Sequence, residues 1–232
     1  MQLTSREAAR LLGVAEPTLE RWIRDGDLAA TRVNDRYRLN RIDLLEFAAA
    51  RNLDVSPALL EDLEQPQALP GLAEAIRAGG VHRDVPGAEK SAILKAVVER
   101  LPLPSDVDRV ILHHVLLARE ALGSTGFGNG IALPHARNPI VLRVARPAVA
   151  VCYLASPVDF DALDGKPVHT LVTLVCPSTR AHLHLLALAA AALRDPGVLA
   201  AVEARADAAA LVREVERFEA ELAARRAGAA KP

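Results

Sequence analysis

Polar and apolar positions near the start of the chain recur with the period of an α-helix. Over Leu3–Leu12, apolar residues return at helical spacing behind a capping signal, Thr4 or Ser5 with Glu7 following. Gly13 ends that helix. A second helix follows directly, with a proline in its first turn and apolar residues on one face. Two short helices joined by a glycine turn predict a helix-turn-helix.

The pattern then changes to alternation. Residues 26–39 alternate and turn at Asn34-Asp35, which predicts a hairpin wing, and residues 41–47 begin a further helix. We therefore expect a small winged helix-turn-helix domain over residues 1–51. Residues 52–76 are punctuated by prolines, and we expect them to form a semi-stiff linker.

Helix and strand patterns alternate through the rest of the chain. The strand-like segments are residues 79–85, 131–135, 147–154 and 168–176, and the helical ones are residues 88–101, 106–122, 179–194 and 198–203. This alternation predicts an α/β fold in which helices cover the faces of a mixed sheet. We expect this domain to span residues 77–222, and residues 223–232 to form a disordered tail at the end of a solvated helix.

Composition narrows the class of protein. Hydrophobic residues make up 51% of the 232 residues and aromatic residues only 3%, so the core must consist of alanine, leucine and valine. The net charge of −1 gives the whole chain no electrostatic case for nucleic acid or an anionic membrane. No secretion signal and no membrane-spanning apolar run is visible, so we expect a cytoplasmic protein without membrane insertion.

A glycine-rich stretch carries the candidate chemistry. Four glycines fall within the eight residues Gly123–Gly130, and an apolar run and Pro134 then lead to His135. Backbone N–H groups of such a loop can cradle an anion, and a neutral imidazole is a competent nucleophile near pH 7. Phosphoryl chemistry is the natural interpretation, although the spacing matches neither the lysine-bearing phosphate loop nor a dinucleotide fingerprint.

Three further segments complete a recognisable pattern. They are residues 119–125 before the histidine, residues 158–168 (VDFDALDGKPV), and residues 181–186 (AHLHLL). Together with the glycine-rich stretch they resemble the type-2 IIA component of the bacterial phosphotransferase system, in its mannitol, fructose and nitrogen-regulatory branches. The resemblance spans about residues 77–222 and implies an α/β/α sandwich.

This resemblance assigns roles to individual residues. His135 matches the histidine that accepts a phosphoryl group from phosphohistidine on the carrier HPr or its nitrogen-branch counterpart. The resemblance implies attack by Nε2 while Nδ1 donates to a backbone carbonyl. Arg119 matches the active-site arginine, a bidentate clamp for phosphate, although pairing with Glu120 is the alternative. His182 matches the second histidine of the family, placed near the first in the fold.

Other residues receive weaker assignments. Ser124, Thr125 and the N–H groups of the loop, including that of Gly130, are candidates for binding phosphate oxygens. His184 is expected to be structural because it points elsewhere on the helix from His182. No metal or cofactor is expected, because donor and acceptor are both histidines. The two cysteines, Cys152 and Cys176, lie in apolar runs without metal-ligand spacing and are expected to be free buried thiols.

The amino-terminal domain resembles the small winged helix-turn-helix of excisionases and MerR-type regulators. That resemblance implies that the second helix enters the major groove and that the wing meets the DNA backbone. The candidate contacts are Arg21 and Arg24 on the helix, and Arg32, Arg36 and Arg38 on the wing. Residues 1–51 hold nine arginines against eight acids, a net charge of +1, which is low for a DNA-binding domain. A docking or dimerisation module is the alternative, and DNA binding by one such module would usually require a homodimer.

These observations lead to one function and two alternatives. The first is a regulatory phosphocarrier in which phosphorylation of His135 changes what the helix-turn-helix domain or a partner protein does. The second is a DNA-binding regulator whose IIA-like domain only senses or dimerises. The third is a sugar-transport IIA component with a vestigial winged domain.

Overall fold

The computed structural model describes residues 2–33, 36–51, 53, 69–105, 107–136 and 144–229. The chain divides into two compact units, residues 1–68 and 69–232. Each unit has its own buried core, as expected for two domains.

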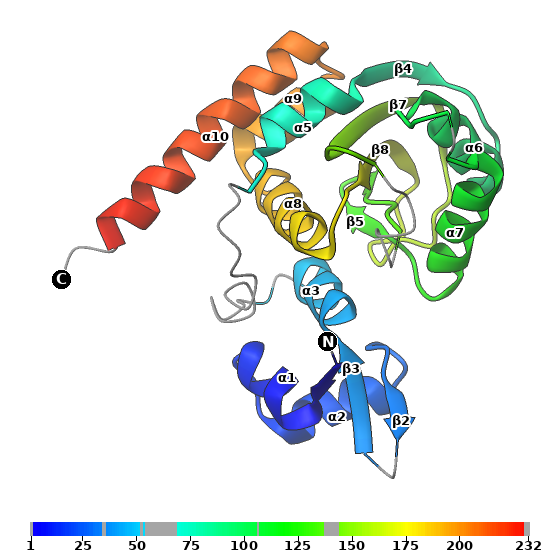
Figure 1. The fold of residues 1–232 in the computed structure, drawn as a ribbon. Helices are drawn as coiled ribbons and strands as arrows, with labels where there is room; N and C mark the ends of the chain where they lie inside the picture. The colour runs from blue at the N-terminus through cyan, green and yellow to red at the C-terminus, as the bar shows by residue number, and fades with distance from the viewer. Residues whose placement is uncertain are drawn as a thin grey trace. The chain divides into compact units, whose positions relative to one another are not determined.

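The smaller unit begins with the predicted helix-turn-helix (Figure 1). Helix α1 (Ser5–Leu11) starts at a capping box in which Thr4 accepts from the Glu7 N–H and the Glu7 carboxylate accepts from the Thr4 N–H. Gly13 takes a φ of 64° in the turn, a conformation that favours glycine. Helix α2 (Glu16–Arg24) then begins with a proline in its first turn.

A three-stranded antiparallel sheet completes this unit. Strands β1 (Gln2–Thr4) and β2 (Thr31–Val33) flank β3 (Arg36–Asn40), which leads directly into α3 (Arg41–Ala50). The predicted hairpin is confirmed, while its turn, residues 34–35, lies outside the described residues. The core is built from fully buried leucines, and the Trp22 and Phe47 rings lie 5.0 Å apart at its margin. The buried leucines with an exposed fraction of zero are Leu19, Leu39 and Leu44.

The larger unit contains the predicted mixed sheet, in the order β4-β7-β8-β6-β5. Its fifth strand, residues 126–128, was not among the four predicted. Its central strands are β7 (Ala148–Val158) and β8 (Val168–Val175), which are antiparallel. The edge strand β4 (Val81–Val85) runs parallel to β7. On the other side, β6 (Ile131–Ala132) runs parallel to β8 and antiparallel to β5 (Gly126–Gly128).

Helices cover both faces of this sheet (Figure 1). One core cluster joins the sheet to α5 (Leu72–Gly79), α8 (Thr179–Ala192), α9 (Pro196–Glu203) and α10 (Ala208–Ala229). The other cluster joins it to α6 (Lys90–Arg100) and α7 (Arg109–Ala121). Because β7 and β8 are buried on both faces, their sequences are almost continuously apolar, and the α/β expectation is confirmed.

Within the described ranges, no single helix is both long and apolar enough to cross a membrane. Helices α8 and α9 meet that criterion of length and composition only as a pair bent by 85°.

The buried cysteines behave as apolar side chains. Cys152 lies in β7 and Cys176 follows β8, and both thiols are free. Burial raises the pKa of each thiol to about 12, which keeps both protonated near neutral pH. This agrees with the expectation from their apolar sequence context.

Several boundaries differ from the sequence predictions. Helix α5 begins inside the range expected to be a linker and continues to Gly79, while residues 54–68 of that range lie outside the described residues. Helix α7 begins at Arg109 instead of residue 106 because Asp108 caps it. Strand β6 ends at Ala132, before the predicted end at residue 135. Helix α10 continues through residues 223–229, which we expected to be disordered. The helix is held by Leu211, Val212 and Val215, which pack into the core beside α5 and α9.

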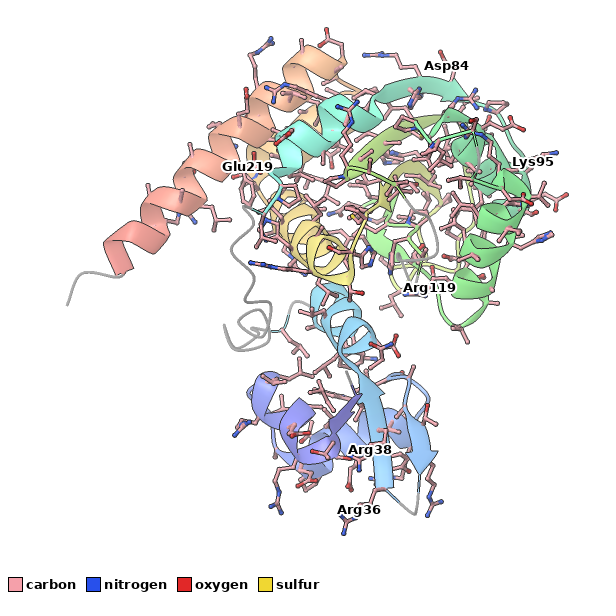
Figure 2. All side chains as sticks on the ribbon, in the orientation of Figure 1. Arg36, Arg38, Asp84, Lys95, Arg119 and Glu219 are labelled. Atoms are coloured by element: carbon pink, nitrogen blue, oxygen red, sulfur yellow. The ribbon has the colours of Figure 1, made fainter. Side chains whose placement is uncertain are left out.

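A long-range contact explains how α5 begins. Its N-cap residue, Gly71, has no side chain to accept the first N–H groups. Glu219 of α10 takes that role, accepting from Leu72 N at 2.5 Å and from Ala73 N at 3.4 Å. Figure 2 shows Glu219 beside the first turn of α5. A helix start is therefore capped by a residue close to the other end of the unit.

Replacing Glu219 with alanine should lower the free energy of unfolding by about 1 kcal/mol, because two N–H groups of α5 lose their acceptor. The matched control is Glu216→Ala on the same helix, which removes only an exposed ion pair with Arg77 and should cost less than about 0.5 kcal/mol. Urea unfolding followed by circular dichroism measures both. Equal losses in the two variants would contradict the capping role.

Candidate functional site

The glycine-rich stretch follows α7 and forms a tight hairpin at one edge of the sheet. Its strands β5 and β6 pair antiparallel, with a register shift between Gly126 and Gly128. Gly128, Asn129 and Gly130 turn with φ values of 101°, 52° and 69°. A side chain at Gly130 would lie 2.4 Å from Cδ2 of His169, so both the conformation and the space require glycine there.

His135 follows β6 and continues its alignment along β8. It forms an isolated parallel bridge with Leu174, and its side chain is 2% exposed. His135 Nδ1 lies 2.6 Å from the carbonyl oxygen of Leu133. Since a carbonyl can only accept, Nδ1 carries a proton, and in the neutral ring the lone pair is therefore on Nε2. This is the arrangement expected from the resemblance.

His182 lies next to His135 in space although far from it in the sequence. It belongs to the first turn of α8, which begins after Ser178 as N-cap. The His135 and His182 rings are tilted by 45° with centroids 5.2 Å apart, and both are buried. The structure therefore brings together the two histidines that the sequence analysis singled out. His184 is half-buried on the same helix.

Arg119 lies four residues before the glycine-rich stretch that begins at Gly123. It belongs to the last turn of α7, and Nη1 donates to the Gly123 carbonyl at 2.8 Å. Figure 2 shows its half-buried side chain at the end of this helix. The neighbouring Glu120 carboxylate turns inward, to Lys90 and Thr125.

The segment 159–165 packs directly against the glycine-rich stretch. A side chain at Gly126 would lie 2.9 Å from Cα of Ala162, so the two backbones touch. Asp164 Oδ2 accepts from Asn129 N at 3.0 Å. Two of the segments that carry the family resemblance thus meet at this contact.

The hydroxyls predicted to bind phosphate are engaged within the fold. Ser124 Oγ donates to the Phe160 carbonyl and accepts from Gly126 N at 3.0 Å. Thr125 Oγ1 donates to Glu120 Oε2 at 2.6 Å. The Gly130 carbonyl accepts from His169 N at 2.8 Å. These contacts give all three residues a role in the shape of the loop.

The sequence analysis did not single out Lys90, Glu120 or Asp161 as functional residues. Lys90 Nζ lies 2.8 Å from Asp161 Oδ2 and 3.5 Å from Glu120 Oε1. Burial lowers the pKa of Lys90, but the hydrogen bond to Asp161 and the charge of Glu120 outweigh it, so the net shift is upward. No local pattern in the sequence distinguishes Glu120, which directly follows the charged Arg119 at the end of α7.

No group of three or more histidine, cysteine or acidic side chains suited to holding a metal ion occurs in the part of the chain that the structure describes.

In the smaller unit, Arg21 and Arg24 are exposed on α2. The register of the hairpin separates the wing arginines, because Arg32 is opposite Tyr37 whereas Arg38 is opposite Thr31. Side chains alternate along a strand, so Arg36 and Arg38 share one face and Arg32 lies on the other. Figure 2 shows Arg36 towards the outer end of β3, with Arg38 further along the strand. The three arginines therefore do not form a single surface.

Each of the two units matches a different family of known proteins. The family described as "Phosphoenolpyruvate-dependent sugar phosphotransferase system, EIIA 2" matches residues 75–217, and a helix-turn-helix domain family matches residues 3–52. The chain is 46% identical over 114 residues to a nitrogen regulatory protein of Pseudomonas aeruginosa, covering 47% of this chain and 71% of that protein. It is 38% identical over 105 residues to a nitrogen regulatory protein of Escherichia coli K12, covering 44% of this chain and 61% of that protein.

A solved structure extends the comparison to the fold. The nitrogen regulatory protein IIA-Ntr of Neisseria meningitidis is 28% identical and superposes with a TM-score of 0.52, covering 63% of this chain and 95% of that structure. The matched parts contain the mixed sheet, its helices and the two facing histidines. The chain therefore belongs to the type-2 EIIA family of the phosphotransferase system, in its nitrogen regulatory branch, and also carries a helix-turn-helix domain.

Proposed function

We propose that this protein is a regulatory phosphocarrier of the cytoplasm that accepts a phosphoryl group on His135 from an HPr-like carrier. The hydrogen bond from Nδ1 to the Leu133 carbonyl is the observation that carries this proposal. It holds the neutral ring in the tautomer whose lone pair is on Nε2, the nitrogen that must form the bond to phosphorus.

The transfer balances without a metal ion. Nε2 of His135 bonds to phosphorus while the N–P bond of the donor's protonated phosphohistidine breaks, and the donor leaves as neutral imidazole. The His135 ring becomes a phosphorylated cation that keeps its Nδ1 proton. Its hydrogen bond to Leu133 is then charge-assisted and stronger, which favours the product.

The surrounding residues supply positioning and charge. Phosphoryl transfer is catalysed mainly by orientation and by donors to the three equatorial oxygens. Arg119 supplies a permanent positive charge at the loop, and His182 supplies a second ring beside the first. Ser124, Thr125 and Gly130 act by holding the loop backbone that faces the phosphoryl group.

Phosphorylation would act as a signal read by the helix-turn-helix unit or by a partner protein. The added charge is the change that such a domain can sense. If the helix-turn-helix unit binds DNA, the exposed Arg21 and Arg24 on α2 would contact the duplex. The protein would then bind as a homodimer.

Replacing His135 with alanine should abolish phosphoryl uptake, because alanine has no nitrogen that could form the bond to phosphorus. Intact mass is measured after incubation with enzyme I, HPr and phosphoenolpyruvate. The matched control, His184→Ala on α8, should still gain one phosphoryl group. A mass gain that persists in His135→Ala would overturn the assignment.

Two exposed leucines flank the glycine-rich stretch and mark where the carrier would dock. Leu122 is 64% exposed at the end of α7, and Leu163 is 77% exposed in the segment that packs on Gly126. Leu122→Glu should raise the donor concentration for half-maximal transfer about tenfold, with little effect on the maximal rate. Val110→Glu is the control, since Val110 is 63% exposed at the other end of α7. Equal effects in the two variants would contradict docking beside the loop.

The DNA-binding alternative has its own test. The full chain is titrated into labelled duplex DNA at several salt concentrations, because phosphate contacts make binding salt-dependent. Replacing Arg21 and Arg24 with alanine should weaken binding and lower the salt slope by about two, if both side chains contact phosphate. The control removes the same charge from α1 through Arg6→Ala and Arg10→Ala and should have a smaller effect. No salt-dependent binding up to about 10⁻⁴ M would exclude this alternative.

A further inference from the structure

We propose that Glu120 is a positioning residue for His135, acting through Thr125 and Leu133 on the carbonyl that accepts the Nδ1 proton. This inference rests on the proposed role of His135 and adds a residue that does not itself contact the reacting ring.

The first link joins α7 to the start of the glycine-rich hairpin. The Glu120 side chain is 4% exposed, and its carboxylate accepts from two donors of Thr125, the backbone N–H and the hydroxyl. The Thr125 N–H lies 3.2 Å from Oε1 and 3.1 Å from Oε2, and the Thr125 hydroxyl lies 2.6 Å from Oε2. A carboxylate can only accept, so both Thr125 donors must turn towards Glu120.

The second link runs through the backbone to the histidine. The Leu133 N–H donates to the Thr125 carbonyl at 2.9 Å, and the Leu133 carbonyl accepts from His135 Nδ1 at 2.6 Å. The pair Gly126 and Ala132 extends the same hairpin ladder. The position of the Leu133 carbonyl therefore depends on the position of Thr125. Successive hydrogen bonds in a series such as this one strengthen one another.

The third link explains why a charge is tolerated here. A buried carboxylate without a partner would be costly. Lys90 of α6 lies 3.5 Å from Glu120 Oε1 and 2.8 Å from Asp161 Oδ2. The charge makes the bonds from Thr125 stronger than those to a neutral acceptor. A rigid acceptor for Thr125 thus results from contacts among two helices and the segment that packs on the loop.

Loss of this acceptor has a defined consequence for the chemistry. If Thr125 shifts, the Leu133 carbonyl shifts with it and no longer favours the proton on Nδ1. The ring then also populates the tautomer with its proton on Nε2, which cannot attack phosphorus. A displacement of about 1 Å at a reacting group can reduce a rate on the order of a hundredfold.

The test uses the full chain labelled with ¹⁵N-histidine and unphosphorylated. The ring ¹⁵N shifts of His135, identified by their absence in His135→Ala, report the tautomer directly. In Glu120→Gln we expect signal from the Nε2–H tautomer, and in the native chain we expect none. We also expect the transfer rate at saturating phospho-HPr to fall about tenfold to a hundredfold, while the concentration for half-maximal rate changes little.

Two further variants separate positioning from general stability. Asp84→Asn removes an exposed carboxylate that pairs with Arg205 and belongs to none of the links between Glu120 and His135, so tautomer and rate should remain native. Thr125→Val removes only the hydroxyl and should reproduce part of the Glu120→Gln effect, which provides the test if Glu120→Gln does not fold.

The outcomes distinguish this inference from the proposed function. A folded Glu120→Gln with a purely Nδ1–H ring and a native rate would overturn the positioning role. If the native chain takes up no phosphate but Glu120→Gln still shifts the tautomer, the positioning role stands and the phosphocarrier proposal fails.

Discussion

The antiparallel pairing of β7 with β8 is the constraint on which the larger unit depends. Both strands are apolar on two faces, so each face needs a helical layer, and the two core clusters supply them. Strand β8 also positions both histidines. Its parallel neighbour β6 continues to His135 opposite Leu174, and its own continuation reaches His182 in the first turn of α8. The ring centroids lie 5.2 Å apart because the same strand, β8, sets the positions of the segments that carry His135 and His182.

Around this apolar frame, the candidate site is held by polar contacts. The glycine-rich hairpin has few side chains that could anchor it by packing, so its position depends on hydrogen bonds to Glu120, Phe160 and Asp164. The charge of Glu120 is balanced by Lys90. In the proposed function, a loop that brings its backbone close to a phosphoryl group would thus remain rigid without bulky side chains.

In the proposed function, one of the two units with separate cores would carry the phosphoryl group and the other would respond to it. A phosphohistidine adds charge at one place without requiring the fold to change, and a helix-turn-helix is a suitable reader of such a change. The split of the wing arginines between two faces restricts how that unit could meet a duplex, because Arg36 and Arg38 cannot act on the same surface as Arg32.

Local signals in the sequence were sufficient for much of this protein. The capping box at Thr4, the glycine turn at Gly13 and the periodicity of each segment depend on neighbouring residues, and the structure follows them. Helix α5 was missed because Glu219, its capping residue, lies at the other end of the unit. The proximity of the two histidine rings was expected only through the family resemblance, whereas the link from Glu120 to His135 and the faces of the wing arginines were beyond sequence reasoning. Strand pairing and helix packing decide all of them, since they join residues that no local pattern connects.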